Sequence, residues 1–136
     1  MDIIVKKITR NFQVAKKDFS SYKTFRQKHS FDKRYEESSK ILIKYPTRIP
    51  VICERFGDDI PDIDRSKYLV PDNLTISQFL YVIRKRIKIP PEKSIYLFIN
   101  KKVMPLGTMQ LSDYYEKHSD EDGFLYITYS GENTFG

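Results

Sequence analysis

The sequence predicts a single α+β domain, and three observations lead to this fold class. Residues 1–45 contain neither proline nor glycine, which favours helix. From residue 46 onward, short β-rich apolar runs alternate with one long and one short amphipathic stretch. The composition, 40% hydrophobic and 14% aromatic over 136 residues, suits one compact core.

Two helices are expected before the first proline. Apolar residues recur every three or four positions over 4–22, with lysine and arginine between them, which is typical of a basic amphipathic helix. A loosely ordered extension is the competing interpretation of this stretch. A second helix is expected over 31–44, with Ser30 as its N-cap and Pro46 as its stop.

Four strands are expected after Pro46. The first covers 49–54, and Pro50 within it indicates either a sheet edge or a strand start. The second covers 67–70 and the last 124–129, after an Asp122-Gly123 turn. The third, 94–99, is a dense apolar run and is expected to be central and covered on both faces.

Two further helices lie between these strands. Thr75 and Gln78 match a capping box, and the helix that follows carries an apolar face and is stopped by Pro90. Thr108 is expected to cap a short helix over 109–117. Two hairpin-like strands, a crossing helix and further strands make a β-grasp arrangement, which is an α+β fold. Residues 130–136 show no core pattern and are expected to form a tail.

The net charge of +6 is concentrated at the front of the chain, with +8 over 1–48 and −2 over 49–136. This asymmetry indicates either an acidic partner or a solvated helical face. No stretch approaches the roughly 18 apolar residues of a membrane span, and no signal peptide is expected. A lone cysteine cannot form an internal disulfide, so a reducing, cytoplasmic setting is expected.

The sequence favours a binding protein over an enzyme. It lacks the spacings of metal ligands, of a nucleophile elbow and of a phosphate-binding loop, so neither a metal nor a cofactor is expected. Cys53 lies in an apolar run and is expected to be a buried, inert thiol. His29 and His118 are expected at the surface, and the acidic run 120–122 is interpreted as loop solvation.

Several stretches of the chain resemble one protein family. They are KILIKYPTRIPVICE at 40–54, KYLVP at 67–71, LTISQF at 74–79, IRKRI at 83–87 and DGFLYITYSGENTFG at 122–136. These motifs resemble the autophagy ubiquitin-like modifiers, which include GABARAP and the microtubule-associated light chain three proteins, and are most similar to the fungal-type founding member. The resemblance covers about residues 25–136 and implies a ubiquitin-like β-grasp fold with two additional N-terminal helices. Residues 1–24 would be a basic amphipathic extension.

The resemblance implies that the chain is a conjugated modifier without catalytic residues of its own. Family members are joined through a C-terminal glycine, here Gly136, to phosphatidylethanolamine by an activating enzyme and a conjugating enzyme. Many are trimmed by a cysteine protease, which is a further candidate partner. The expected location is the cytoplasm and, after lipidation, the membrane of the autophagosome or of other vesicles. The unconjugated protein is expected to be a monomer.

The resemblance also implies that cargo receptors and adaptors bind through a short motif of an aromatic residue, two variable residues and an aliphatic residue. Such a peptide would add as a strand beside the second strand, where alternation separates two pockets. The implied aromatic pocket consists of Glu37, Ile41, Pro50, Lys67, Leu69 and Phe124. The implied aliphatic pocket consists of Tyr68, Val70, Pro71, Leu74, Phe79, Val82, Ile83 and Arg86. Acidic residues beside the motif would meet Arg48, Arg65 and Lys67.

Two other functions compete with this interpretation. The chain could be a β-grasp adaptor, peptide-binding or cytoskeletal, that is never conjugated. Nucleic-acid binding by the basic front would predict a steep salt dependence, but no recognised reading motif supports it, and nucleic acid is not an expected partner.

Overall fold

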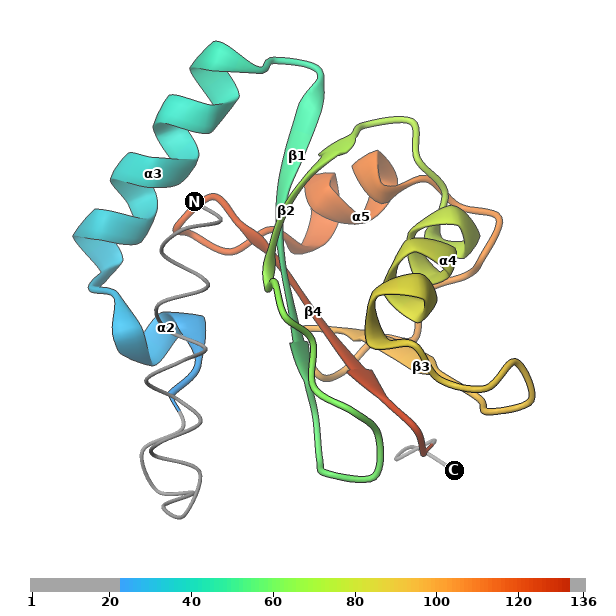
Figure 1. Cartoon of the computed structure of the whole chain (residues 1–136). Coiled ribbons are helices and arrows are strands. Elements are labelled where there is room, and N and C mark those ends of the chain that lie inside the picture. The colour runs from blue at the N-terminus through green and yellow to red at the C-terminus, as the bar shows by residue number, and fades with distance from the viewer. Residues whose placement is uncertain (1–22, 133–136) are drawn as a thin grey trace.

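The computed structural model describes residues 23–132, so the predicted helix over 4–22 and the tail residues 133–136 lie outside the described residues. A four-stranded mixed sheet stands between two layers of helices (Figure 1). The first layer holds α2 (Phe25–Lys28) and α3 (Phe31–Lys44). The second holds α4 (Ile76–Ile87) and α5 (Leu111–His118).

The strand order β2-β1-β4-β3 confirms the predicted β-grasp arrangement. Strand β1 (Arg48–Arg55) pairs antiparallel with β2 (Lys67–Pro71) and parallel with β4 (Leu125–Ser130). Strand β3 (Tyr96–Ile99) pairs antiparallel with β4. The crossing helix α4 separates the β1–β2 hairpin from the other two strands.

Pro50 lies near the start of a strand but not at a sheet edge, so one of the two alternatives for this residue is wrong. Strand β1 lies between β2 and β4. Pairing with β4 begins only at Val51, opposite Leu125, which is one residue after Pro50. The missing N–H of the proline therefore falls where the parallel ladder has not yet begun, and no ladder hydrogen bond is lost.

The expectation that 94–99 is a central strand is wrong. Among the described strands, β3 pairs with β4 alone and forms one end of the sheet. Leu97 and Phe98 point to opposite faces of the sheet, and both are nearly inaccessible, with 5% and 2% exposure. A continuously apolar run therefore indicates that both faces are buried, and it does not indicate where the strand lies in the sheet.

Side-chain caps fix the starts of α4 and α3, and the sequence predicted both caps. The Thr75 hydroxyl accepts the Gln78 N–H at 3.2 Å, and the Gln78 amide oxygen accepts the Thr75 N–H at 2.9 Å, which confirms the capping box of α4. Ser30 caps α3 by accepting the Lys33 N–H at 3.3 Å. None of the helices within 23–132 is long and apolar enough to cross a bilayer.

Two helix starts differ from the prediction. The proposed cap Thr108 is wrong, because α5 begins at Leu111 and the Asp113 carboxylate accepts the N–H of Gln110 at 3.1 Å. The short helix α2 was not predicted from the apolar pattern of the sequence, although the family resemblance implied two N-terminal helices. It begins with a second capping box, formed by Thr24 and Gln27, which carries the same Thr-x-x-Gln signature as the start of α4.

Each face of the sheet has its own apolar cluster. The larger cluster joins β1, β3 and β4 to α4 and α5 and contains Cys53, Phe79 and Ile83, all fully buried. The smaller cluster on the α3 face contains Phe25, Ile52, Phe124 and Tyr126, with Ile41 of α3 packed against it. Strand β1 contributes residues to both clusters and lies between β2 and β4, so it is central to the fold.

The interpretation of the acidic run 120–122 as loop solvation is wrong for Asp122, which is fully buried. One of its carboxylate oxygens accepts hydrogen bonds from Arg34 at 2.6 Å and from the Tyr126 hydroxyl at 2.5 Å. The other oxygen accepts the Phe124 N–H at 2.9 Å, and the Asp122 carbonyl accepts the Ser38 hydroxyl. Burial and the bond to Asp122 raise the pKa of Tyr126 to about 12. This network ties α3 to the start of β4.

Gly123 is required beside this network. Its φ of +90° is one that residues with side chains rarely adopt, and an added Cβ would collide with the Ser38 hydroxyl. The Gly123 N–H donates to the Asp120 carbonyl at 2.9 Å, which confirms the predicted turn.

Asp122→Ala tests how far α3 depends on this network. The substitution leaves the Arg34 side chain, which is 13% exposed, without its buried partner, and we expect the free energy of unfolding to fall by about 3 kcal/mol. Urea denaturation measures the change. As a control, Glu36→Ala breaks the exposed Glu36–Lys40 pair and should cost less than about 0.5 kcal/mol. Equal losses in the two variants would contradict a structural role for Asp122.

Candidate functional site

Strand β2 forms an end of the sheet, with no strand of the described residues beyond it. The Cys53 N–H donates to the Ser66 carbonyl at 2.7 Å, so the hydrogen-bonded pairs of the antiparallel ladder continue through Tyr68 and Val70. The N–H and C=O groups of Lys67 and Leu69 therefore point away from β1, toward the edge of the sheet. This edge presents main-chain groups with which an extended segment could pair.

The six residues of the predicted aromatic pocket lie together on the α3 face of the sheet. Lys67 and Leu69 stand opposite Ile52 and Pro50 of β1 on this face. The Lys67 ammonium pairs with the Glu37 carboxylate of α3. Phe124 and Ile41 belong to the small cluster beneath them, and Pro50 is buried.

The predicted aliphatic pocket lies on the opposite face, between β2 and α4. The Tyr68 ring meets the Phe79 ring edge-on, with 5.8 Å between centroids, and the Arg86 guanidinium lies 5.9 Å from the Tyr68 centroid. Arg86 also pairs with Asp64 at 3.1 Å. The other members are Val70 and Ile83, which are buried, Leu74, which packs on the same cluster, and Pro71 and Val82, which are exposed.

The residues of the two predicted pockets differ in exposure: some are accessible, and others are buried beneath them. Phe79, Ile83 and Phe124 have no exposed surface, so they support the residues above them. Leu69 is half-buried, and Val82 retains 38% exposure. A bound segment would first meet the β2 backbone, Leu69 and the outer side of α4.

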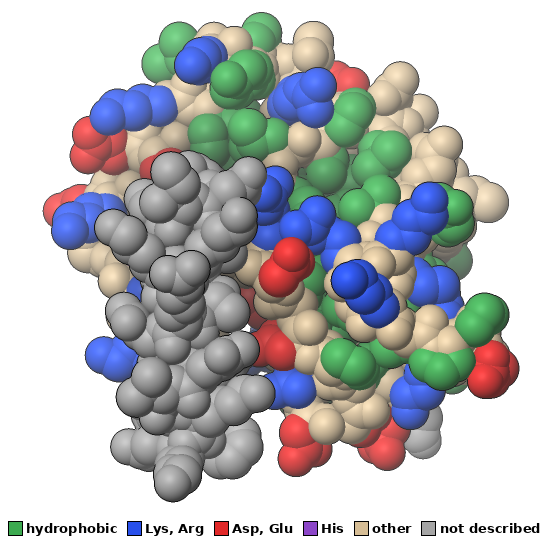
Figure 2. Space-filling view, in the orientation of Figure 1, with side chains coloured by type: hydrophobic (Ala, Val, Ile, Leu, Met, Phe, Trp, Pro, Cys, Tyr) green, Lys and Arg blue, Asp and Glu red, His purple; other side chains and the backbone are tan. Residues whose placement is uncertain are grey.

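Basic side chains border the β2 edge. The Arg48 guanidinium donates to the Leu69 carbonyl at 3.1 Å, so one outward-pointing acceptor of β2 already attracts a cation. Lys67 lies two residues before Leu69 and points to the same face of the sheet as Leu69. Arg65, which is half-buried, lies just before β2. Figure 2 shows hydrophobic side chains between α3 and α4, bordered by Lys and Arg side chains. The three cations predicted to meet an acidic flank thus lie in or beside the β1–β2 hairpin.

Two residues that sequence reasoning did not assign also lie at this site. Phe25 packs edge-on against Phe124 at 5.2 Å, and the Lys67 ammonium lies 5.5 Å from the Phe25 centroid. The His29 ring contacts Phe25 at 4.8 Å, and burial lowers the pKa of His29 although Glu37 opposes the shift. The capping box at Thr24 was the available signal, because it starts a helical turn that aligns 25 with 29.

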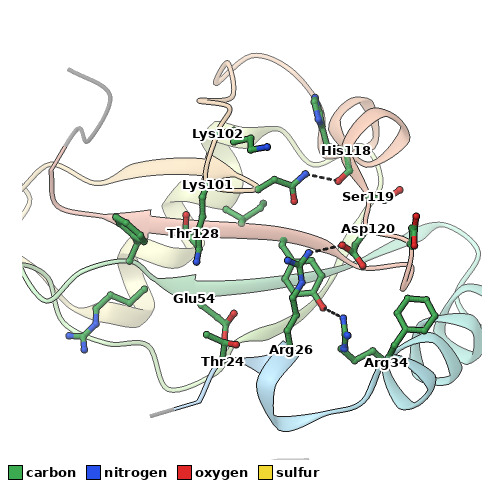
Figure 3. Close-up of a pocket in the computed structure, with 17 residues that line it drawn as sticks. Thr24, Arg26, Arg34, Glu54, Lys101, Lys102, His118, Ser119, Asp120 and Thr128 are labelled. Carbon is green, nitrogen blue, oxygen red and sulfur yellow. Dashed lines mark hydrogen bonds and ion pairs between the residues drawn. The ribbon is translucent and has the colours of Figure 1, made fainter. Parts of the chain in front are cut away.

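A second hollow, a cavity of about 820 Å³, is lined by none of the residues predicted for peptide binding. Its walls carry charges of both signs. Arg26 of α2 pairs with Asp120 at 2.6 Å, while Lys101 and Lys102 come from the turn after β3 (Figure 3). The Arg26 guanidinium also stacks on Tyr126 at 3.9 Å, so this guanidinium is already engaged.

The described residues offer neither an accessible thiol nor a metal centre. Cys53 is completely buried in β1, and burial raises the pKa of its thiol, which keeps it protonated. Within residues 23–132, no group of three or more His, Cys, Asp or Glu side chains is placed to hold a metal ion.

Comparison with known proteins points to the same family as the sequence motifs. Residues 33–136 match the family model described as autophagy protein Atg8, ubiquitin like. Autophagy-related protein 8 of Mycosarcoma maydis is 58% identical over 82% of this chain and 95% of its own length. Autophagy-related protein 8d of Arabidopsis thaliana is 56% identical over 83% and 94%. Autophagy-related protein 8 of Saccharomyces cerevisiae is 54% identical over 83% and 97%.

Amide hydrogen exchange tests the orientation of the β2 backbone. The Leu69 N–H points away from β1 and should exchange at least about tenfold faster than the N–H groups of Tyr68 and Val70, which lie in the ladder. Exchange resolved by NMR on the free protein measures this alternation. A Leu69 amide as protected as that of Val70 would mean that another part of the chain covers the edge.

Proposed function

Because this chain belongs to the Atg8 family of ubiquitin-like autophagy proteins, we propose that it is a modifier joined through Gly136 to phosphatidylethanolamine. In this role it recruits cargo receptors and adaptors that carry an aromatic-x-x-aliphatic motif to autophagosomal membranes. It is a substrate of activating and conjugating enzymes and has no catalytic residue of its own.

The observation that carries the recruiting function is the edge position of β2. The outward-pointing backbone of Leu69 can exchange hydrogen bonds with an extended peptide, independently of the peptide's sequence. Strand alternation then separates the peptide's two anchors. The aromatic anchor meets the Lys67 and Leu69 side, and the aliphatic anchor meets the Tyr68 and Val70 side.

The cations beside β2 favour peptides with acidic neighbours. The Lys67–Glu37 pair on the aromatic side is partly buried, and Glu37 is its more exposed member, so a peptide carboxylate can compete with Glu37 for the ammonium. Arg48 already hydrogen-bonds a β2 carbonyl and can turn toward an acidic residue at the edge. These contacts contribute more to orientation and association rate than to affinity.

The conjugation chemistry explains the need for a terminal glycine. The Gly136 carboxylate attacks ATP and forms an acyl adenylate with loss of pyrophosphate. An enzyme thiolate then displaces AMP to give a thioester, and the lipid amine displaces the thiolate to give an amide. Because the only cysteine of the chain is buried, the thiolates must belong to the enzymes. Glycine lacks a Cβ, so its carboxyl group can enter a narrow transfer site.

Reconstitution tests conjugation directly. We expect the protein to form a thioester with its cognate activating and conjugating enzymes in the presence of ATP. With vesicles that contain phosphatidylethanolamine, it should form a product of altered gel mobility. Gly136→Ala should abolish or strongly slow both steps. A wild-type protein that forms no thioester, or a Gly136→Ala variant that reacts equally fast, would refute the proposal.

Peptide binding is tested separately by calorimetry with an aromatic-x-x-aliphatic peptide. Leu69→Ala should weaken binding by about 1–3 kcal/mol, as expected for an anchor contact. Leu106→Ala, at a 65% exposed position outside β2 and α4, is the matched control and should leave the affinity unchanged. Peptide binding by a protein that cannot be conjugated would favour the alternative of an unconjugated adaptor.

A further inference from the structure

Three segments meet where the last strand gives way to the tail. They are the loop after β1, which carries Asp59, the turn after α4, which carries Lys93, and Gly131, the first residue after β4. A Cβ built on Gly131 would lie 2.8 Å from the Asp59 Oδ2 atom and 3.3 Å from the Lys93 Cε atom. The two side chains therefore flank the glycine so closely that a side chain at this position would push the Asp59 carboxylate aside.

The loop that carries Asp59 is fixed to the end of β4. The Phe56 N–H donates to the Tyr129 carbonyl at 2.9 Å, and the Tyr129 hydroxyl donates to the Pro61 carbonyl at 2.8 Å. Arg55 adds a bond to the Ile60 carbonyl at 3.0 Å, and Ile60 is anchored in the core at 2% exposure. Both ends of the loop are thus held by the strand that leads into the tail.

The Asp59 carboxylate has an unsatisfied oxygen at this position. Its Oδ2 atom is buried and has no hydrogen-bond partner among the described residues. Buried polar atoms without partners are rare in folded proteins, and each calls for an explanation. Because this oxygen lies against Gly131, it can accept a hydrogen bond from the backbone of the tail.

We infer that Asp59 and Lys93 form a notch that holds Gly131 and sets the direction in which the tail leaves the domain. Both are positioning residues for the conjugation of Gly136, and the inference rests on the proposed function. Residues 131–136 span at most about 20 Å when extended, so a change of direction at Gly131 displaces the reactive carboxyl group by several ångströms. Misplacement by about 1 Å can slow a reaction by two orders of magnitude.

The test compares Asp59→Ala, Lys93→Ala, Gly131→Ala and the double variant Asp59→Ala/Gly131→Ala with wild type in thioester formation. Asp59→Ala and Gly131→Ala should each lower the rate about tenfold, and Lys93→Ala should lower it by a smaller factor. The double variant should be no slower than Gly131→Ala alone, because removing the carboxylate relieves the collision with the new Cβ. Asp58→Ala and Glu92→Ala are neighbouring controls and should react at the wild-type rate. Motif-peptide affinity and melting temperature should stay constant across the series.

A measurement without enzymes separates this inference from the proposed function. The ¹H–¹⁵N heteronuclear NOE of Gly131 and Glu132 should be high in wild type, fall in Asp59→Ala and stay unchanged in Asp58→Ala. If the wild type forms no thioester, the proposed function fails, and the NOE comparison still decides whether the notch holds the tail. Wild-type rates in both Asp59→Ala and Gly131→Ala, or an unchanged NOE in Asp59→Ala, would overturn the inference.

Discussion

Strand β2 lies at one end of the sheet, and the proposed binding of peptides depends on this position. An edge strand presents a row of main-chain donors and acceptors that can pair with another chain. Here the strand is short, begins with Lys67 and ends with Pro71, and these features limit uncontrolled pairing. Such an edge can accept one extended segment at a time, and its alternating side chains point to both faces of the sheet.

The two sides of that edge are held by different means. On one side, α4 packs its apolar face into the main core, with Phe79 and Ile83 fully buried beneath β2. On the other, α3 shares a small apolar cluster with the sheet, and the buried Asp122 carboxylate and the Glu37–Lys67 ion pair add polar contacts. Asp122, near the end of the chain, thus fixes the helix that presents Glu37 to Lys67.

Local sequence patterns predicted much of this fold, because strand alternation and helix capping depend on residues that are close together in the sequence. The alternation in 67–70 and the capping box at Thr75 each depend on neighbours in sequence, and both are found in the structure. The buried Asp122 and the edge position of β3 depend on partners far along the chain, so the sequence misled on both. Phe25 and His29 were missed because a helical turn of four residues leaves little periodicity. The assignment of pocket residues came from family resemblance and not from pattern.

The proposed recruiting function depends on where a motif peptide binds. Titration of the ¹⁵N-labelled protein with an aromatic-x-x-aliphatic peptide, followed by intermolecular NOEs, addresses this directly. We expect the largest changes in chemical shift in residues 67–70 and in α4, with NOEs between the peptide backbone and β2. Shift changes confined to the cavity beside Lys101 and Arg26, with β2 unaffected, would contradict this expectation.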